Sequence, residues 1–130
     1  MADQERQPSG YRPPASAEEL IRRHQAGERW FAGTELPDGA ALRGADLSGA
    51  NLRACWLSDA DFRGADLRST AFDGSNLKLS DFRDADLSGA SLREALLCGA
   101  KFSGARTEGV TVTGATFYGV PLVSLGGLLE

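Results

Sequence analysis

Residues 45–74 read ADLSG ANLRA CWLSD ADFRG ADLRS TAFDG, and the same five-residue phase runs from residue 40 to residue 124. The central position of each cycle, from Leu42 to Leu122, is leucine or phenylalanine in fifteen of seventeen cycles. The residue two places before it is small or β-branched in every cycle. This unbroken period decides the fold.

The period fits neither a helix nor a straight strand. A five-residue step advances about 500° around an α-helix, so the central residues would spread over all of its faces. In a strand, side chains alternate between faces, so an odd spacing would send successive central residues to opposite sides. A chain that turns a corner once per cycle points the central residue and its small partner inward on every side. The pattern therefore predicts a solenoid.

Glycine marks the expected corners, because it follows the central residue by two positions in ten of seventeen cycles. Glycine adopts the backbone angles that tight turns demand and other residues resist. This pattern resembles the pentapeptide-repeat family over residues 40–124. The resemblance implies an all-β solenoid, a right-handed quadrilateral β-helix with about twenty residues per coil and about four coils in all.

A coil of four cycles assigns each central residue to one of four sides. The inner columns are side one (Leu42, Phe62, Phe82, Phe102, Leu122), side two (Leu47, Leu67, Leu87, Thr107), side three (Leu52, Phe72, Leu92, Val112) and side four (Leu57, Leu77, Leu97, Phe117). The small partners, from Ala40 to Val120, form a second inner ring, so that large and small side chains together fill a narrow tube. Because Thr107, Val110, Val112 and Val120 depart from the pattern, we expect the last coil to pack less regularly.

The segment before the repeats predicts one short helix that acts as a cap. Residues 1–14 are polar and contain proline, and we expect them to lack order. Within residues 15–39, Ser16 and Glu19 have the capping-box spacing, and a helix from Ala17 to about Ala26 would end at Gly27. Its apolar residues, with those that follow it, offer a lid for the first coil. The candidate contacts are Leu20, Ile21, Trp30, Phe31 and Leu36. The alternative is a flexible leader.

The C-terminal tail, residues 125–130, is apolar and follows the last repeat. Leu125, Leu128 and Leu129 would not face water together. They either cover the far end of the solenoid or meet the tail of a second copy. The first interpretation needs no partner and is preferred.

The chain has few residues of the types that perform catalysis or bind metals. His24 is the only histidine and lies on the predicted helix, and Cys55 and Cys98 belong to coils about 10 Å apart, too far for a disulfide. We expect no metal site, no cofactor and no catalytic residue, and therefore not an enzyme. His24 is interpreted as a helix-surface or cap-packing residue. Aspartates that stack along the outside are interpreted as ion-pair partners of stacked arginines.

The composition of the chain limits the classes of partner that it could bind. The net charge is −4 with 25% charged residues, and there is no basic stripe for nucleic acid, no membrane-length apolar run and no signal-peptide core. We expect a cytoplasmic, bacterial type of protein. Some pentapeptide-repeat proteins imitate duplex DNA and bind type II topoisomerases such as gyrase, giving quinolone resistance. Residues 40–124 hold ten acidic and nine basic residues, which makes this alternative function less favoured.

Side four breaks the polar pattern of the other three sides. Apolar residues occupy outward positions there or at its corner, namely Trp56, Leu79, Leu96, Cys98 and Tyr118. Clustered apolar groups on a charged surface mark contact sites. The sequence therefore predicts a non-enzymatic interaction or scaffold module that docks a protein partner or a second copy through this strip. An N-terminal segment folded over the strip is the alternative.

Overall fold

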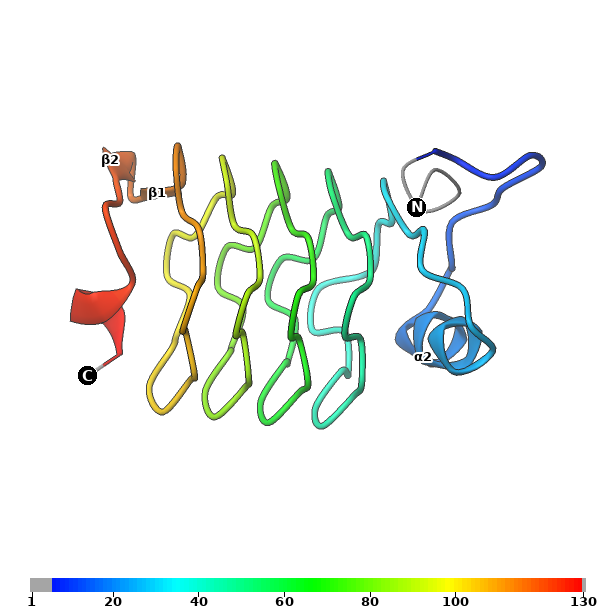
Figure 1. The fold of residues 1–130 in the computed structure, drawn as a ribbon, viewed down its shortest axis with the longest axis horizontal. Helices are drawn as coiled ribbons and strands as arrows, with labels where there is room; N and C mark the ends of the chain where they lie inside the picture. Colours follow the sequence, from blue (N-terminus) through cyan, green and yellow to red (C-terminus); the bar gives the residue numbers. More distant parts are fainter. Residues whose placement is uncertain (1–5, 130) are drawn as a thin grey trace.

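The computed structural model describes residues 6–129, which form one stack of coils with a helix at the N-terminal end (Figure 1). The elements in chain order are α2 (Ala17–Gln25), β1 (Thr116–Phe117), β2 (Val120–Pro121) and the 3-10 helix η1 (Gly126–Leu128). Of the expected leader, residues 1–5 lie outside the described residues. Residues 6–14 run beside α2, where the Arg23 guanidinium donates to the Arg12 carbonyl at 2.8 Å and Pro14 is buried.

Parallel bridges twenty residues apart hold the coils together. Asp61 pairs with Asp81, and Asp66 pairs with Asp86, through outward positions just before the central residue. The Leu67 amide donates to the Asp86 carbonyl at 2.8 Å, and the Asp86 amide donates back to the Ala65 carbonyl at 3.0 Å. Each side thus joins the next coil through one short parallel rung.

The predicted corners have left-handed backbone whether or not glycine occupies them. Gly44 and Gly64 have φ of 68° and 66° two places after the central residue. Leu79 and Asp84 hold the same position with φ of 63° and 61°. Left-handed conformations cost L-residues about 1–2 kcal/mol, so the repeated ladder imposes the corner on these side chains.

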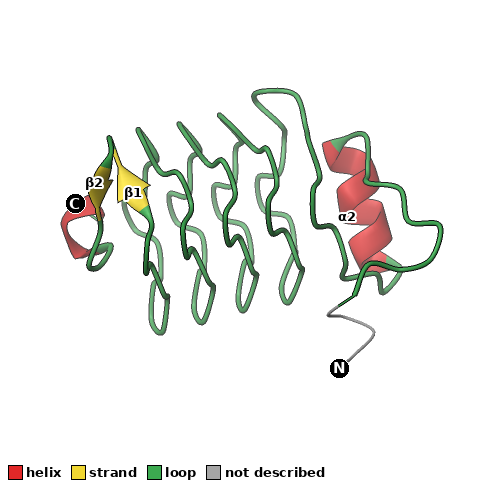
Figure 2. Ribbon diagram, turned by 90° about the horizontal axis from the view of Figure 1, so that it is seen from above, coloured by secondary structure: helices red, strands yellow, loops and turns green. Residues whose placement is uncertain are grey.

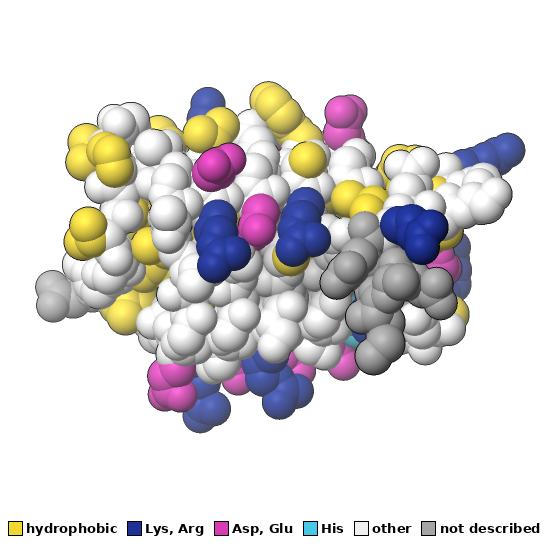
Figure 3. Space-filling view, turned by 45° about the horizontal axis from the view of Figure 1, so that its top comes forward, with side chains coloured by type: hydrophobic (Ala, Val, Ile, Leu, Met, Phe, Trp, Pro, Cys, Tyr) yellow, Lys and Arg dark blue, Asp and Glu magenta, His cyan; other side chains and the backbone are white. Residues whose placement is uncertain are grey.

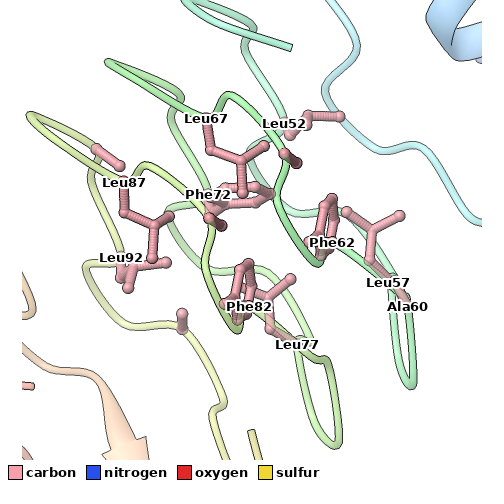
Figure 4. Close-up of a cluster of buried hydrophobic side chains, with 14 of the residues drawn as sticks. Leu52, Leu57, Ala60, Phe62, Leu67, Phe72, Leu77, Phe82, Leu87 and Leu92 are labelled. Atoms are coloured by element: carbon pink, nitrogen blue, oxygen red, sulfur yellow. The ribbon is translucent and has the colours of Figure 1, made fainter. Parts of the chain in front are cut away.

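The central side chains fill the inside of the tube, as Figure 4 shows for one cluster. Those from Leu42 to Phe102 are fully buried. The rings of Phe62, Phe82 and Phe102 stack in parallel at centroid distances of 5.0 and 5.1 Å, and Phe72 meets Phe62 and Phe82 edge-on. Hydroxyl groups in the second inner ring, which the small partners form, connect successive coils. For example, Ser75 Oγ donates to the Leu52 carbonyl at 2.7 Å.

The ladder begins earlier than residue 40. Trp30 pairs with Asn51, and Glu35 pairs with Trp56, twenty-one residues apart. Phe31 and Leu36 are buried as the first members of the columns on sides three and four, so they belong to the tube and not only to a lid above it. The sequence pattern missed them because the cycle that contains Leu36 has six residues.

The last cycle does not follow the ladder. Strand β1 pairs with β2 in an antiparallel hairpin, and Tyr118 and Gly119 at its tip both have positive φ, 52° and 77°. Val120, assigned to the inner ring, is instead 63% exposed, and Leu122 is only half-buried. The inward assignment of these two residues is therefore corrected, because the chain reverses where the five-residue period would continue the coil.

Helix α2 lies across the N-terminal end of the stack (Figure 2). Ser16 Oγ accepts a hydrogen bond from the Glu19 amide at 3.1 Å, which fixes the helix start, and Ala26 is the C-cap. Leu20 is fully buried against the core. His24 is also buried, with Nε2 2.8 Å from the Ser48 carbonyl of the first coil, so this histidine packs the helix onto the coil stack.

Candidate interaction surface

The side-four strip, defined as Trp56, Leu79, Leu96, Cys98 and Tyr118, is at the surface. Trp56 is 53%, Leu79 55%, Leu96 41% and Tyr118 67% exposed, while Cys98 is half-buried. No described segment covers these four side chains. Residues 6–14 lie beside α2 and not over the strip. For these residues, the alternative in which the N-terminal segment covers the strip is wrong.

The strip has a flat part and a corner part. On the flat part, bridges run from Trp56 through Asn76 to Leu96, so Asn76 separates the two apolar side chains. Asn76 is buried, and its Oδ1 accepts from the Lys78 amide at 3.1 Å. Sequence reasoning missed this polar break, although an Asn placed two residues before a turn amide is the usual signal for such a side-chain-to-backbone bond.

At the corner, Leu79, Cys98 and Tyr118 come together around Gly99. A Cβ on Gly99 would lie 2.6 Å from Leu79 Cδ2 and 3.6 Å from the Tyr118 hydroxyl. A hydrogen bond with the Cys98 thiol raises the pKa of Tyr118. Gly99 thus leaves space for the Leu79 side chain and the Tyr118 hydroxyl, which both lie beside it.

Opposite charges alternate on the neighbouring sides. Figure 3 shows one face, on which basic and acidic side chains are interspersed over the coils and hydrophobic groups gather along the upper edge and towards the C-terminal end. Arg63 and Arg83 donate to the aspartates two residues before them, with Nη2 to Oδ2 distances of 2.9 and 2.6 Å for Asp61 and Asp81. Arg68 does the same to Asp66 at 2.7 Å. Arginine therefore neutralises Asp61, Asp66 and Asp81, whereas Asp46 and Asp86 accept hydrogen bonds from the Ser48 and Ser88 hydroxyls at 2.7 and 2.6 Å.

Asp61 offers a test of these ion pairs. Hydrogen bonds from the Arg63 guanidinium lower the pKa of Asp61 to about 2. Because the folded-state pKa lies below the unfolded value of about 3.9, the pair contributes stability above about pH 4 and loses it as pH falls through about 2. We expect an NMR titration of the Asp61 carboxyl to show this low midpoint, and Arg63→Gln to raise it towards the ordinary value. An unchanged midpoint in Arg63→Gln would contradict the pairing.

The residues expected at the two ends pack as follows. Leu20 and Phe31 are fully buried, and Ile21 and Trp30 are half-buried. At the other end Leu125 is buried, and Leu128 and Leu129 are half-buried against the core. The tail therefore lies on the last coil of its own chain.

Both cysteines are free. Burial raises the pKa of the Cys55 thiol to about 12, and Cys55 Sγ lies 3.3 Å from the Phe31 carbonyl oxygen, inside the tube. Over residues 6–129 no three His, Cys, Asp or Glu side chains are grouped so that they could hold a metal ion. In the same range, none of the helices is long and apolar enough to cross a bilayer.

Comparison with known proteins identifies the repeats. A family model described as pentapeptide repeats matches residues 45–84 and 80–119. Among solved structures, a pentapeptide repeat protein from Nostoc PCC 7120 is 36% identical with a TM-score of 0.64, covering 78% of this chain and 79% of its own. No curated protein matches the sequence.

Two further structures are similar over shorter stretches. HetL, a pentapeptide repeat protein involved in heterocyst differentiation regulation in Nostoc sp. strain PCC 7120, is 32% identical with a TM-score of 0.37, covering 65% of this chain and 40% of its own. QnrB1, a plasmid-mediated fluoroquinolone resistance protein, is 21% identical with a TM-score of 0.47, covering 66% and 61%.

Proposed function

This chain belongs to the pentapeptide-repeat family, and from that premise we propose that it is a non-enzymatic interaction module that docks a protein partner or a second copy through the side-four strip. The module is a rigid rod of about four coils with helix α2 as its N-terminal cap, and it acts in the cytoplasm. Partners would bind its outward-facing side chains, because the central side chains occupy the interior.

One observation carries the proposal: Trp56, Leu79, Leu96 and Tyr118 are each more than 40% exposed on a rod whose sides one and two carry paired charges. Exposed aromatic and aliphatic side chains are the groups that contribute most at protein interfaces. The rigid ladder holds them in place without a partner, so docking would cost little conformational entropy.

The test replaces Trp56 and Leu96 together by aspartate. Aspartate occupies the same outward position in five other cycles, at Asp46, Asp61, Asp66, Asp81 and Asp86, so the fold should persist. The matched control carries Ala71→Asp and Ser91→Asp, the same positions on side three. In quantitative pull-downs, we expect the wild type and the control to capture the same proteins and the strip variant to lose them. If the partner is a second copy, light scattering should show a dimer for the wild type and the control and a monomer for the strip variant.

Circular dichroism should give the same spectrum for the three proteins. If partners and oligomeric state were also the same for all three, the strip would not be the interface.

Imitation of DNA is the second function that the family resemblance raises. A duplex mimic needs dense unpaired negative charge, whereas Asp61, Asp66 and Asp81 each have an arginine partner. This pairing favours the interaction module. Inhibition of gyrase supercoiling by micromolar protein would reverse that preference.

A further inference from the structure

Successive rungs of side three are joined by a fixed set of backbone hydrogen bonds. The Leu92 amide donates to the Thr111 carbonyl of the next coil at 2.8 Å, and the Thr111 amide donates back to the Ala90 carbonyl at 3.2 Å. The corner amide of Glu94 donates to the Thr113 carbonyl at 2.9 Å. Each rung therefore offers two amides and one carbonyl to the coil that follows it.

The last rung of side three, residues 110–114, has the same three groups without partners. Over residues 6–129, the Val112 and Gly114 amides donate no hydrogen bond and the Val110 carbonyl accepts none. Side four differs, because the Ala115 carbonyl accepts from the Leu122 amide of the tail at 2.9 Å. The tail thus pairs with the edge of side four and leaves two donors and one acceptor open on side three.

A hollow of about 710 Å³ lies along this open rung. All of residues 110–114 line it, and the tail contributes Leu125 and Leu129. Val110, which occupies an inward position, is only half-buried there, whereas its counterpart Ala90 is fully buried one coil earlier. Because one water takes about 30 Å³ in the liquid, the hollow has room for a short stretch of polypeptide chain.

The open backbone groups indicate a polypeptide ligand in an extended conformation. Two donors, at Val112 and Gly114, with an acceptor at Val110 are the pattern that a parallel strand satisfies. Extended peptides add to exposed strand edges of this kind through their main chain. An apolar small molecule would leave all three groups without partners in a half-enclosed site, which costs free energy.

The side chains of the rung indicate which peptide fits. In the register of the inner rungs, a peptide places a small residue over Val110, a middle residue over Thr111 and a large apolar residue over Val112. The middle position favours serine or threonine, because the Thr111 hydroxyl donates to Ser91 Oγ at 3.2 Å and can accept from a further hydroxyl. The outward column beneath this position carries no charge, since its members are Asn51, Ala71, Ser91 and Thr111.

We propose that the hollow binds an extended segment of a partner protein, which adds to residues 110–114 as a parallel strand and carries the pattern small residue, serine or threonine, leucine or phenylalanine. The carbonyl of the middle residue accepts from the Val112 amide, and its amide donates to the Val110 carbonyl. The carbonyl two residues later accepts from the Gly114 amide. This inference does not rest on the side-four strip, so either proposal can fail while the other stands.

An end-blocked peptide that copies residues 88–96, SGASLREAL, tests the proposal because it contains the pattern Ala-Ser-Leu. We expect an NMR titration of the wild-type protein to move the Val112 and Gly114 amide protons downfield, with a Kd below about 1 mM. A methyl group on the backbone nitrogen of the peptide's serine removes the donor to the Val110 carbonyl and should weaken binding at least about tenfold. A methyl group on the nitrogen of the peptide's leucine, whose amide points away from the rung, should leave the Kd within about threefold.

Val112→Pro removes the central donor from the protein, since proline has no amide hydrogen, and should weaken binding at least about tenfold when the Gly114 amide is followed. Thr107→Pro makes the same change on side two and is the matched control, with a Kd within about threefold of wild type. Neither amide makes a hydrogen bond within the part of the chain that the structure describes. Melting temperatures check that both variants keep the last coil folded.

The strip variant, Trp56→Asp with Leu96→Asp, should bind the peptide as the wild type does, and a loss of binding would contradict a separate site. Amide protons of Val112 and Gly114 that stay in place at about 2 mM peptide would overturn the proposal. Equal Kd values for the two methylated peptides would overturn strand addition. Slow hydrogen exchange of the same two amides without peptide would also overturn it, because the rung would already be paired with the tail or a second copy.

Discussion

Phe82→Ala is expected to lower the free energy of unfolding by about 3–5 kcal/mol, the usual cost of truncating a buried phenylalanine. The ring is fully buried and stacked between Phe62 and Phe102, with Phe72 at its edge. The tube has fixed walls, because the backbone ladder spaces the coils, so neighbouring rings cannot collapse into the cavity.

Urea unfolding followed by circular dichroism measures this loss. Phe117→Ala is the matched control, since Phe117 is half-buried in β1 at the irregular end, and it should cost clearly less. The same experiment with Leu67→Ala should give about 2–5 kcal/mol. A loss below about 1 kcal/mol for Phe82 would mean that the ring does not fill the tube, whatever the burial of its neighbours.

Leu20→Ala should have the second largest effect, with about 2–5 kcal/mol lost. Leu20 is fully buried where helix α2 meets the first coil. Removal of its side chain weakens the closure of a tube whose end would otherwise expose core. His24 would then hold the helix through its bond to the Ser48 carbonyl with less apolar support.

Glu18→Ala, on the exposed side of the same helix, is the control and should change stability by less than about 0.5 kcal/mol. Hydrogen exchange gives a second measurement. In Leu20→Ala the amides of Asn51 and Trp56, which donate to carbonyls of residues 29 and 34, should exchange faster than those of the central coils. Equal stability of the two variants would show that α2 does not close the tube.

The tube was predictable from sequence because one constraint repeats in every cycle. Leu47, Phe82 and Leu97 occupy inward positions as the five-residue period predicts. Corner conformation was also predictable, and it holds even at Leu79, where the side chain resists it. In these positions the ladder overrides local preference.

The ends were harder to predict, since each depends on a single local event. The extra residue in the cycle that contains Leu36 broke the five-residue phase, so the pattern did not identify Phe31 and Leu36 as inner residues. At the other end the Tyr118-Gly119 turn reversed the chain while the period still assigned Val120 inward. One inserted residue or one turn shifts the register of all that follows.

The side-four strip was predictable as a set of outward residues, but its division into a flat part and a corner part was not. Leu79 and Tyr118 lie beside the same corner, at Gly99, only because successive coils stack in this register. Asn76 interrupts the flat part because its side chain turns to the backbone. Such relations join residues twenty or forty apart, and only the three-dimensional stack shows which of them meet.

Scalar couplings across hydrogen bonds test the coil register most directly. In a long-range HNCO experiment we expect central amides to correlate with the carbonyl nineteen residues later, as Leu47 donates to Asp66, Phe62 to Asp81 and Leu67 to Asp86. Correlations from these amides to carbonyls four residues earlier, or to any other regular offset, would contradict the four-sided tube.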